Sequence, residues 1–349
     1  MSVRGATASP RRVTVLQSFP APRPTTNPYL VQLLACATPE IQIVTFSWSR
    51  ALLGRYDVVH LHWPEVLLRG NTRPRTWARR ALFAALLTRL SVSGTPLVRT
   101  IHNLASHETG PWSERMLIAG AERRTTAWIR LNPTTVPPTS APVFTIPHGD
   151  YSDWFSGLPV PPAESGRILY FGLIRPYKGV EQLLEAFGRT SDDALRLRVV
   201  GKPADDSLVA RIRSSCTADA RVDARLEYID DPTLANEVGR AELVVLPFRE
   251  MHNSGSLLLA LSLARPVLVP ANEVTAALAA EVGPGWVFTY VGDLTADDLT
   301  STLKLIESGP RTGGPDLSRR TWDTIGQQHR EVYRRVAGVE PTSPGRVTG

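Results

Sequence analysis

The chain has 349 residues, of which 42% are hydrophobic, 21% charged and 7% aromatic. This composition is typical of a globular protein with a buried core, and it excludes disordered, collagen-like and coiled-coil proteins. At roughly 150 residues per domain, the length indicates two domains. The formal net charge of +6 is modest for this length, and we expect no nucleic-acid partner.

The two cysteines, Cys36 and Cys216, are far apart in sequence and have no Cys-x-x-Cys or His-x-x-x-His companion. This pattern argues against a disulfide framework or a structural zinc site, and it favours a reducing compartment. The apolar run 13–16 is too short for a signal peptide, and no run approaches the roughly 18 apolar residues of a membrane-spanning helix. We therefore expect a cytoplasmic protein that does not span the membrane.

Short apolar runs alternate with helical patterns through the first half of the chain. Strands are expected at residues 12–17, 41–46, 57–61, 96–101, 127–131 and 143–147. Helices are expected at residues 27–36, 75–90 and 112–124. This alternation predicts a parallel sheet with helices on both faces.

The same alternation restarts after a polar, proline-rich stretch. Strands are expected at residues 167–171, 195–200, 225–229, 243–247, 266–269 and 286–290, and helices at 179–187, 206–215, 232–240 and 256–264. The predicted fold class is α/β, with two Rossmann-like doubly wound domains at 1–150 and 167–316 and a linker at 151–166. A last helix at 317–337 is expected to return to the first domain, followed by a frayed tail at 338–349.

Polar side chains gather where three strands of the first domain end. In open α/β sheets, ligands bind at the carboxyl ends of the strands, and five of the chain's seven histidines lie there. The candidate residues are His60, His62, Trp63 and Glu65, then His102, Asn103, His107 and Glu108, and then His148. The sequence therefore predicts a polar ligand-binding cleft at this edge of the sheet.

A metal site is a rival interpretation, because His60, His62, His102, His107 and Glu108 could be ligands. We expect His60 and His62 to point to opposite faces of their strand and therefore not to bind one ion together. The chain also lacks the Asp-x-Asp pair that holds the metal in one-domain nucleotide-sugar enzymes. We therefore expect no metal.

The second domain opens with a basic turn between its first strand and its first helix. Arg175 and Lys178 lie in this turn, and Gly179 begins the helix. Cations beside a helix N-terminus suit a diphosphate, because the backbone N–H groups there also favour an anion. Lys202, one of only three lysines in the chain, follows the next strand. A second helix start offers hydroxyls and backbone N–H groups to the same kind of ligand, at Asn253, Ser254, Gly255 and Ser256.

Signatures of other enzyme classes are missing from the sequence. It contains no Walker lysine motif, no Gly-x-Gly-x-x-Gly and no Gly-x-Ser-x-Gly elbow. The sequence therefore does not support assignment as an ATPase, a dinucleotide-dependent enzyme or a serine hydrolase.

Together, the motifs resemble a known family. HLHWPE, IHNLASHE, IPHGDY, FGLIRPYKG and NSGSLLLALSLARPVLVP are similar to segments of GT-B glycosyltransferases. More narrowly, they resemble the bacterial GDP-mannose:glycolipid 4-β-D-mannosyltransferases, which include exopolysaccharide enzymes. The resemblance implies a GT-B enzyme that transfers mannose from GDP-mannose to a lipid-linked glycan, with the donor on the second domain and the acceptor on the first. It also implies that no cofactor or metal is needed, because cations and helix dipoles neutralise the leaving diphosphate.

The chain departs from the larger retaining relatives. They carry an arginine directly after the glycine and two glutamates flanking the donor, whereas this chain has Leu173, Met251 and Leu259 there. Without that carboxylate pair we expect an inverting reaction, which needs one general base near the acceptor hydroxyl. The candidates for the base are Glu108, Glu65 and His107. By the same resemblance, His102 matches a position that contacts the donor sugar.

A basic stretch of the sequence bears on where in the cell the protein is located. Residues 66–101 contain no Asp or Glu, and their arginines surround Trp77 and several apolar residues. A basic, apolar helix suits contact with anionic lipid headgroups, so we expect peripheral association with the inner face of the plasma membrane. The all-round apolar segment 81–87 fits a buried helix equally well.

Two alternative functions stay open. One is a non-catalytic nucleotide-sugar or glycan-binding protein of the same fold. The other is a glycosyltransferase that uses another donor, such as UDP-glucose.

Overall fold

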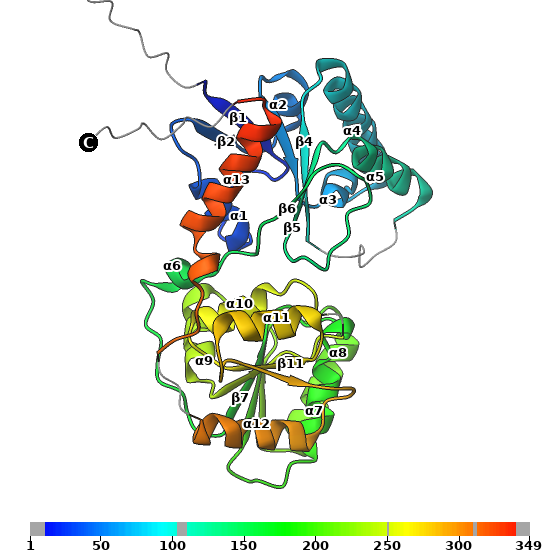
Figure 1. Cartoon of the computed structure of the whole chain (residues 1–349). Coiled ribbons are helices and arrows are strands. Elements are labelled where there is room, and N and C mark those ends of the chain that lie inside the picture. Colours follow the sequence, from blue (N-terminus) through cyan, green and yellow to red (C-terminus); the bar gives the residue numbers. More distant parts are fainter. Residues whose placement is uncertain (1–10, 103–109, 250, 310–312, 340–349) are drawn as a thin grey trace, which may run out of the picture. The chain divides into compact units, whose positions relative to one another are not determined.

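The computed structural model describes residues 11–102, 110–249, 251–309 and 313–339. The chain forms two compact units, Met1–Gly149 with Arg320–Gly349 and Asp150–Arg319. Each unit is an α/β structure built on its own six-stranded sheet (Figure 1). The predicted fold class of two Rossmann-like units is confirmed.

The first sheet is parallel throughout, in the order β2-β1-β3-β4-β5-β6. Its strands are β1 (Val13–Gln17), β2 (Ile41–Val44), β3 (Val58–Leu61), β4 (Leu97–Ile101), β5 (Ala127–Arg130) and β6 (Val143–Thr145). The chain order reverses between β1 and β3, so the connections leave these strands in opposite directions. Such a switch point opens a crevice at the carboxyl ends of the strands.

The helices of the first unit include one from the far end of the chain. They are α1 (Pro28–Ala35), α2 (Trp48–Leu53), α3 (Pro64–Leu68), α4 (Arg73–Ser93), α5 (Trp112–Arg124) and α13 (Trp322–Val336). α13, red in Figure 1, lies beside α1 and β1. Its buried residues Trp322, Ile325, Val332 and Tyr333 complete the core under β1. The first unit is therefore finished by the last helix of the chain.

The second sheet is also parallel, in the order β12-β11-β10-β7-β8-β9. Its strands are β7 (Arg167–Phe171), β8 (Arg196–Val200), β9 (Val222–Arg225), β10 (Leu243–Val245), β11 (Val267–Pro270) and β12 (Val287–Tyr290). Its α-helices are α6 (Ser152–Phe155), α7 (Val180–Gly188), α8 (Asp206–Ala218), α9 (Asp231–Arg240), α10 (Gly255–Ser262), α11 (Glu273–Val282) and α12 (Ala296–Ser308). Short 3-10 turns lie at Pro176–Lys178 and Ser318–Arg320. Its switch point lies between β7 and β10.

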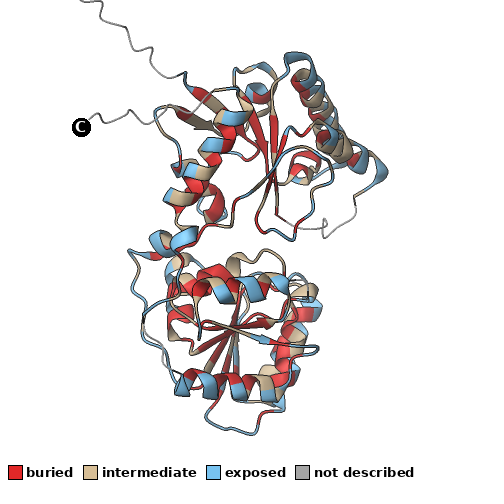
Figure 2. Ribbon diagram, viewed as in Figure 1, coloured by how far each residue is buried: buried red, intermediate tan, exposed pale blue. Residues whose placement is uncertain are grey.

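The strands form the centre of each core, as Figure 2 shows by the red colour along them. Parallel strands that are covered on both faces are continuous apolar runs rather than alternating ones. The run 168–171 in β7 and the whole of β10 are buried in this way.

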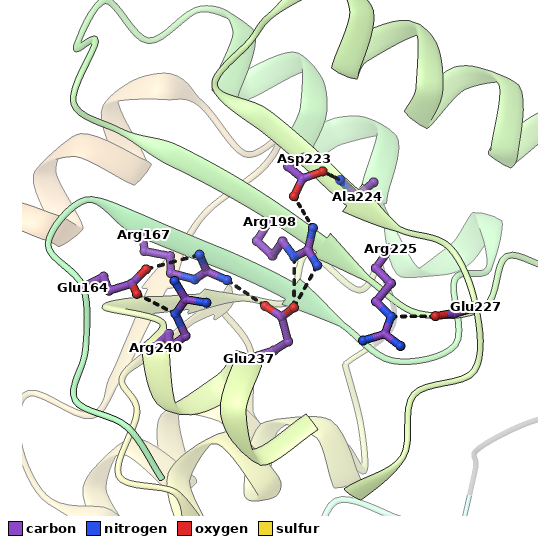
Figure 3. A network of polar contacts seen from close by, with 9 residues as sticks. All are labelled: Glu164, Arg167, Arg198, Asp223, Ala224, Arg225, Glu227, Glu237 and Arg240. Carbon is purple, nitrogen blue, oxygen red and sulfur yellow. Dashed lines mark hydrogen bonds and ion pairs between the residues drawn. The ribbon is translucent and has the colours of Figure 1, made fainter. Parts of the chain in front are cut away.

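A charged network ties α9 to the second sheet (Figure 3). The carboxylate of Glu237, which is almost fully buried, accepts from Arg167 at 2.7 Å and from Arg198 at 2.8 Å. Arg198 also contacts Asp223, and Arg167 contacts Glu164 at 3.2 Å. Removing one partner of such a buried group leaves an uncompensated charge, which costs about 3 to 5 kcal/mol. The network therefore fixes α9 against β7 and β8.

The sequence misplaced or missed several elements. A strand was expected at 225–229, but β9 ends at Arg225 because it pairs with β8 from Val222 onward. β9 is an edge strand with an alternating burial pattern, so its apolar signal is weak. Helices α11 and α12 were not predicted. The segment 151–166 carries α6 and places Tyr151 and Phe155 in the second core.

No helix within the described ranges is long and apolar enough to cross a membrane.

Candidate active site

A buried polar network joins α13 to the ends of three strands. The ring of His60 is hydrogen-bonded through Nδ1 to the Tyr333 hydroxyl at 2.8 Å and through Nε2 to Thr100 Oγ1 at 2.7 Å. Gln17 Nε2 donates to the same Tyr333 oxygen at 3.1 Å. All four side chains are buried. The Tyr333 hydroxyl of α13 thus binds side chains from both β1 and β3.

The network continues from Gln17 to the edge of a pocket. His62 Nε2 lies 3.0 Å from Gln17 Oε1, and His62 Nδ1 lies 3.0 Å from His102 Nε2. An amide oxygen only accepts hydrogen bonds, so His62 Nε2 donates and its Nδ1 accepts from His102. The other face of His102 stacks on the ring of Trp63, with the centroids 4.0 Å apart. This chain of contacts sets the orientation of both rings.

The expectation that His60 and His62 point to opposite faces was wrong. Their ring centroids are 4.1 Å apart. Side chains two positions apart along an extended strand share a face, and His62 directly follows β3, so the two rings lie on the same side. Both rings therefore turn into the same buried network.

Burial keeps these histidines neutral. Loss of water lowers the pKa of His60, His62 and His102 well below 6.5, and neighbouring histidines lower it further. His329 of α13, whose Nδ1 donates to Ile325 O at 2.9 Å, has its pKa lowered to about 4 by the same burial. His148 adjoins the network through Tyr29, whose ring lies 4.8 Å from His148 and 5.4 Å from His102, and burial lowers the pKa of His148 to about 4.

A pocket of about 190 Å³ opens beside the network at the ends of β3, β4 and β5. Trp63, His102 and Glu65, which is in the first turn of α3, contribute to its lining. Arg99 crosses the pocket, where its guanidinium meets Glu122 at 3.0 Å and lies over the Trp128 ring at 5.3 Å. Burial lowers the pKa of Arg99, while Glu122 opposes that shift. The pocket thus offers stacking rings together with both signs of charge.

Three of the expected residues, Asn103, His107 and Glu108, lie outside the described residues.

The second unit forms a cradle above Gly172, where β7 ends. A Cβ added at Gly172 would lie 3.4 Å from Ser256 Oγ and 3.8 Å from Lys178 Nζ, so these two groups face one space. Gly172 has φ +110°, which disfavours other residues, and Gly179 has φ +66° with Pro247 O lying where a Cβ would be. Because these two positions carry no side chain, the backbone lies close to a polar space at the switch point of the second sheet.

The ammonium group of Lys178 is largely shielded from water. Its ammonium lies over the Phe248 ring at 4.6 Å, and burial together with the nearby Arg175 lowers its pKa to about 8. A cation that has lost water beside a second cation is stabilised when an anion binds. Ser256 belongs to the first turn of α10, where Ser254 Oγ accepts from Leu257 N at 3.2 Å.

The remaining expected donor residues are spread around this cradle. Asn253 and Gly255 flank the cap of α10, with Gly255 as its first residue. Lys202 is exposed and lines an apolar pocket with Glu227 and Tyr228, and this pocket adjoins the cradle because Gly172 also lines it.

No group of three or more His, Cys, Asp or Glu residues within the part of the chain that the structure describes is arranged to hold a metal ion.

Several residues of the first site were missed from the sequence. Arg99, Glu122 and Trp128 line the pocket, and Gln17 and Tyr333 orient its histidines. An arginine inside the apolar run 97–101 was the one available signal, because a buried strand rarely carries a charge without a partner.

Comparison with known proteins agrees with this geometry. Residues 165–303 match the family described as Glycosyl transferases group 1. The GDP-mannose:glycolipid 4-beta-D-mannosyltransferase of Xanthomonas campestris pv. campestris is 49% identical over 341 residues, covering 97% of each chain. HepE from Anabaena in complex with UDP-glucose has a TM-score of 0.59 at 14% identity, covering 93% of this chain and 96% of that one. The catalytic domain of starch synthase IV from Arabidopsis thaliana, bound to ADP and acarbose, has a TM-score of 0.63 at 10% identity, covering 95% and 100%.

The two parallel-sheet units, together with the relatives just described, define a glycosyltransferase of the GT-B fold. The chain belongs to the family of the GDP-mannose:glycolipid 4-beta-D-mannosyltransferases.

The buried histidines predict a pH-dependent stability. Their folded pKa lies below 6.5, so the unfolded chain binds more protons in acid. The contribution of each histidine is complete above about pH 6.5 and falls by about 1.4 kcal/mol per pH unit below it; for His329 the fall continues to about pH 4. Urea unfolding at several pH values above about 5, where carboxylates contribute little, measures this slope. An unfolding free energy that stays constant from about pH 7 to about pH 5 would contradict it.

Proposed function

We propose that this enzyme transfers mannose from GDP-mannose to a lipid-linked glycan at the inner face of the plasma membrane, in the synthesis of a surface polysaccharide or glycolipid. The observation that carries the proposal is the 49% identity over 97% of both chains to an enzyme named for that donor and a glycolipid acceptor. The two sites support it, because one suits a diphosphate and the other suits a sugar.

The donor diphosphate binds at the cradle of the second unit. Lys178 and Arg175 supply the charge, and Ser256 and the N-terminus of α10 supply hydrogen bonds. Gly179, Lys202, Asn253, Ser254 and Gly255 complete the donor-binding set. Because these cations already balance the leaving group, the reaction proceeds without a metal ion or other cofactor.

The acceptor sugar binds in the pocket beside Trp63 and His102. Aromatic faces such as Trp63 pack on sugar rings, and Arg99 and Glu65 reach hydroxyl groups. His60, which is fully buried, and His62 act by orienting His102. Asn103 and His148 complete this acceptor side, and His102 contacts the donor sugar.

The reaction inverts the configuration of the transferred sugar. Mannose in GDP-mannose is α-linked, and the product named for the relative is β-linked. Inversion in one step needs a general base at the acceptor hydroxyl, opposite the leaving diphosphate. We assign this base to Glu108, with Glu65 and His107 as the other candidates.

Membrane contact uses the exposed starts of α4 and α5. Trp77 is 64% exposed, Trp112 67% and Met116 46%, and Arg73, Arg75 and Arg115 are exposed beside them. Arg80 lies over the Trp77 ring at 5.8 Å and donates to Ser113 at 2.8 Å, so the two helix starts adjoin. Exposed tryptophans among arginines suit an anionic lipid surface. Arg69 and Arg80, expected there from the sequence, instead pair with the buried Glu114.

Lys178→Ala should weaken binding of GDP by about 10 to 150-fold, because a charge-assisted contact contributes about 1.5 to 3 kcal/mol. Affinity should also fall as the pH rises through about 8, where Lys178 loses its charge. Titration calorimetry measures both effects, and UDP-glucose, the alternative donor, should bind more weakly than GDP-mannose. Lys304→Ala, an exposed lysine on α12, is the matched control. Unchanged GDP affinity in a folded Lys178→Ala protein would exclude this cradle as the diphosphate site.

Glu108→Gln should keep GDP-mannose affinity and lose transfer by about 100 to 10,000-fold, because it removes the proton acceptor but keeps the shape. Glu65→Gln should be milder, and Glu307→Gln, at an exposed position on α12, should be unaffected. Release of GDP in the presence of a lipid-linked acceptor is the readout. If only Glu65→Gln is inactive, the base is Glu65. A wild-type protein that binds GDP-mannose but releases no GDP with any acceptor would instead be a non-catalytic binder.

A further inference from the structure

A large apolar pocket lies in the first unit, next to the proposed acceptor pocket. Its volume is about 610 Å³, within the range of small-molecule sites. It opens at the carboxyl ends of β1, β2 and β3, at the switch point of the sheet. Its walls are mainly aromatic and aliphatic, and include Phe19, Leu30, Phe46, Trp48, Trp63 and Val66.

The hydroxyl and amide oxygens that line this pocket already accept hydrogen bonds from backbone N–H groups of the chain. Ser18 Oγ accepts from His62 N at 2.9 Å, and Asn27 Oδ1 from Tyr29 N at 3.0 Å. In the same way, Thr26 Oγ1 accepts from Arg23 N at 2.8 Å and Ser47 Oγ from Arg50 N at 3.2 Å. A sugar placed here would lose hydration and gain few new hydrogen bonds, whereas a hydrocarbon chain loses nothing. The lining therefore favours an apolar ligand.

The position of this pocket connects two features of the proposed function. Trp63 lines it and also lines the acceptor pocket, so the two spaces adjoin at this residue. One turn along α3 from Trp63, Val66 is 61% exposed, and Arg79 of α4 donates to the Val66 carbonyl at 3.4 Å. Arg79 follows Trp77 in the first turns of α4, where we place the membrane contact. The pocket thus extends from the acceptor site toward the lipid surface.

We infer that this pocket binds the first carbons of the acceptor's lipid chain, while the glycan lies across Trp63 in the neighbouring pocket. The inference rests on the proposed function, because it assumes a lipid-linked acceptor. The enzyme then recognises both the lipid chain and the glycan of the acceptor. The enzyme would then select lipid-linked glycans over free glycans even away from a membrane.

The test uses hexyl, octyl and decyl β-D-glucosides, each kept below its micelle-forming concentration so that no lipid surface is present. Binding to the full-length wild-type protein, measured by calorimetry, should strengthen by up to about fourfold for each added CH₂, since each buried CH₂ contributes about 0.8 kcal/mol. Val66→Glu places a charge at the opening of the pocket at an exposed position, so folding should be unaffected. It should weaken decyl glucoside binding at least about tenfold and flatten the dependence on chain length.

Val92→Glu is the matched control, because Val92 is 85% exposed near the end of α4 and does not line the pocket. It should keep the wild-type series. Affinities that do not change with chain length in the wild type, or a Val66→Glu series equal to that of Val92→Glu, would overturn the inference. Failure of the proposed function appears separately, as absence of transfer from GDP-mannose while the chain-length series persists.

Discussion

The hydrogen bond between the Tyr333 hydroxyl and His60 Nδ1, at 2.8 Å, is the contact on which the first unit depends. It joins the last helix of the chain to β3, and Gln17 extends it to His62 and then to His102. Each member is buried, so an unmade bond costs about 1 to 3 kcal/mol. The ring of His102 therefore faces the pocket in one orientation, which depends on residues more than two hundred positions later in the chain.

The second unit contains a charged group, the Lys178 ammonium, that is partly removed from water. Lys178 lies beside Phe248 and near Arg175, which destabilises its charged form and lowers its pKa to about 8. A bound diphosphate would relieve this cost by pairing with both cations. The glycines at 172 and 179 matter for the same reason, because they let the backbone approach the space that the anion would fill. Neutral histidines fix one another's orientation in the first unit, and a desolvated cation faces the cradle in the second.

The sequence was sufficient for the fold class, because strand–helix alternation is a local signal, and the described candidate residues of the first site lie near strand ends as expected. It could not reveal contacts that depend on tertiary packing. The pairing of Tyr333 with His60 and the position of Arg99 over Trp128 join distant segments. The meeting of His60 and His62 was missed for a different reason, because residues two positions apart along a strand share a face and we expected opposite faces. The edge strand β9 was misplaced because only one of its faces is buried.

The central claim is that this family member builds a β-mannoside from GDP-mannose by inversion on a lipid-linked glycan. The most direct measurement is the one-bond carbon–proton coupling at the anomeric carbon of the transferred mannose, by NMR, after reaction in EDTA. We predict β-linked mannose, formed at the same yield as without the chelator. An α-linked product, or a product that forms only when a divalent metal is restored, would contradict this account.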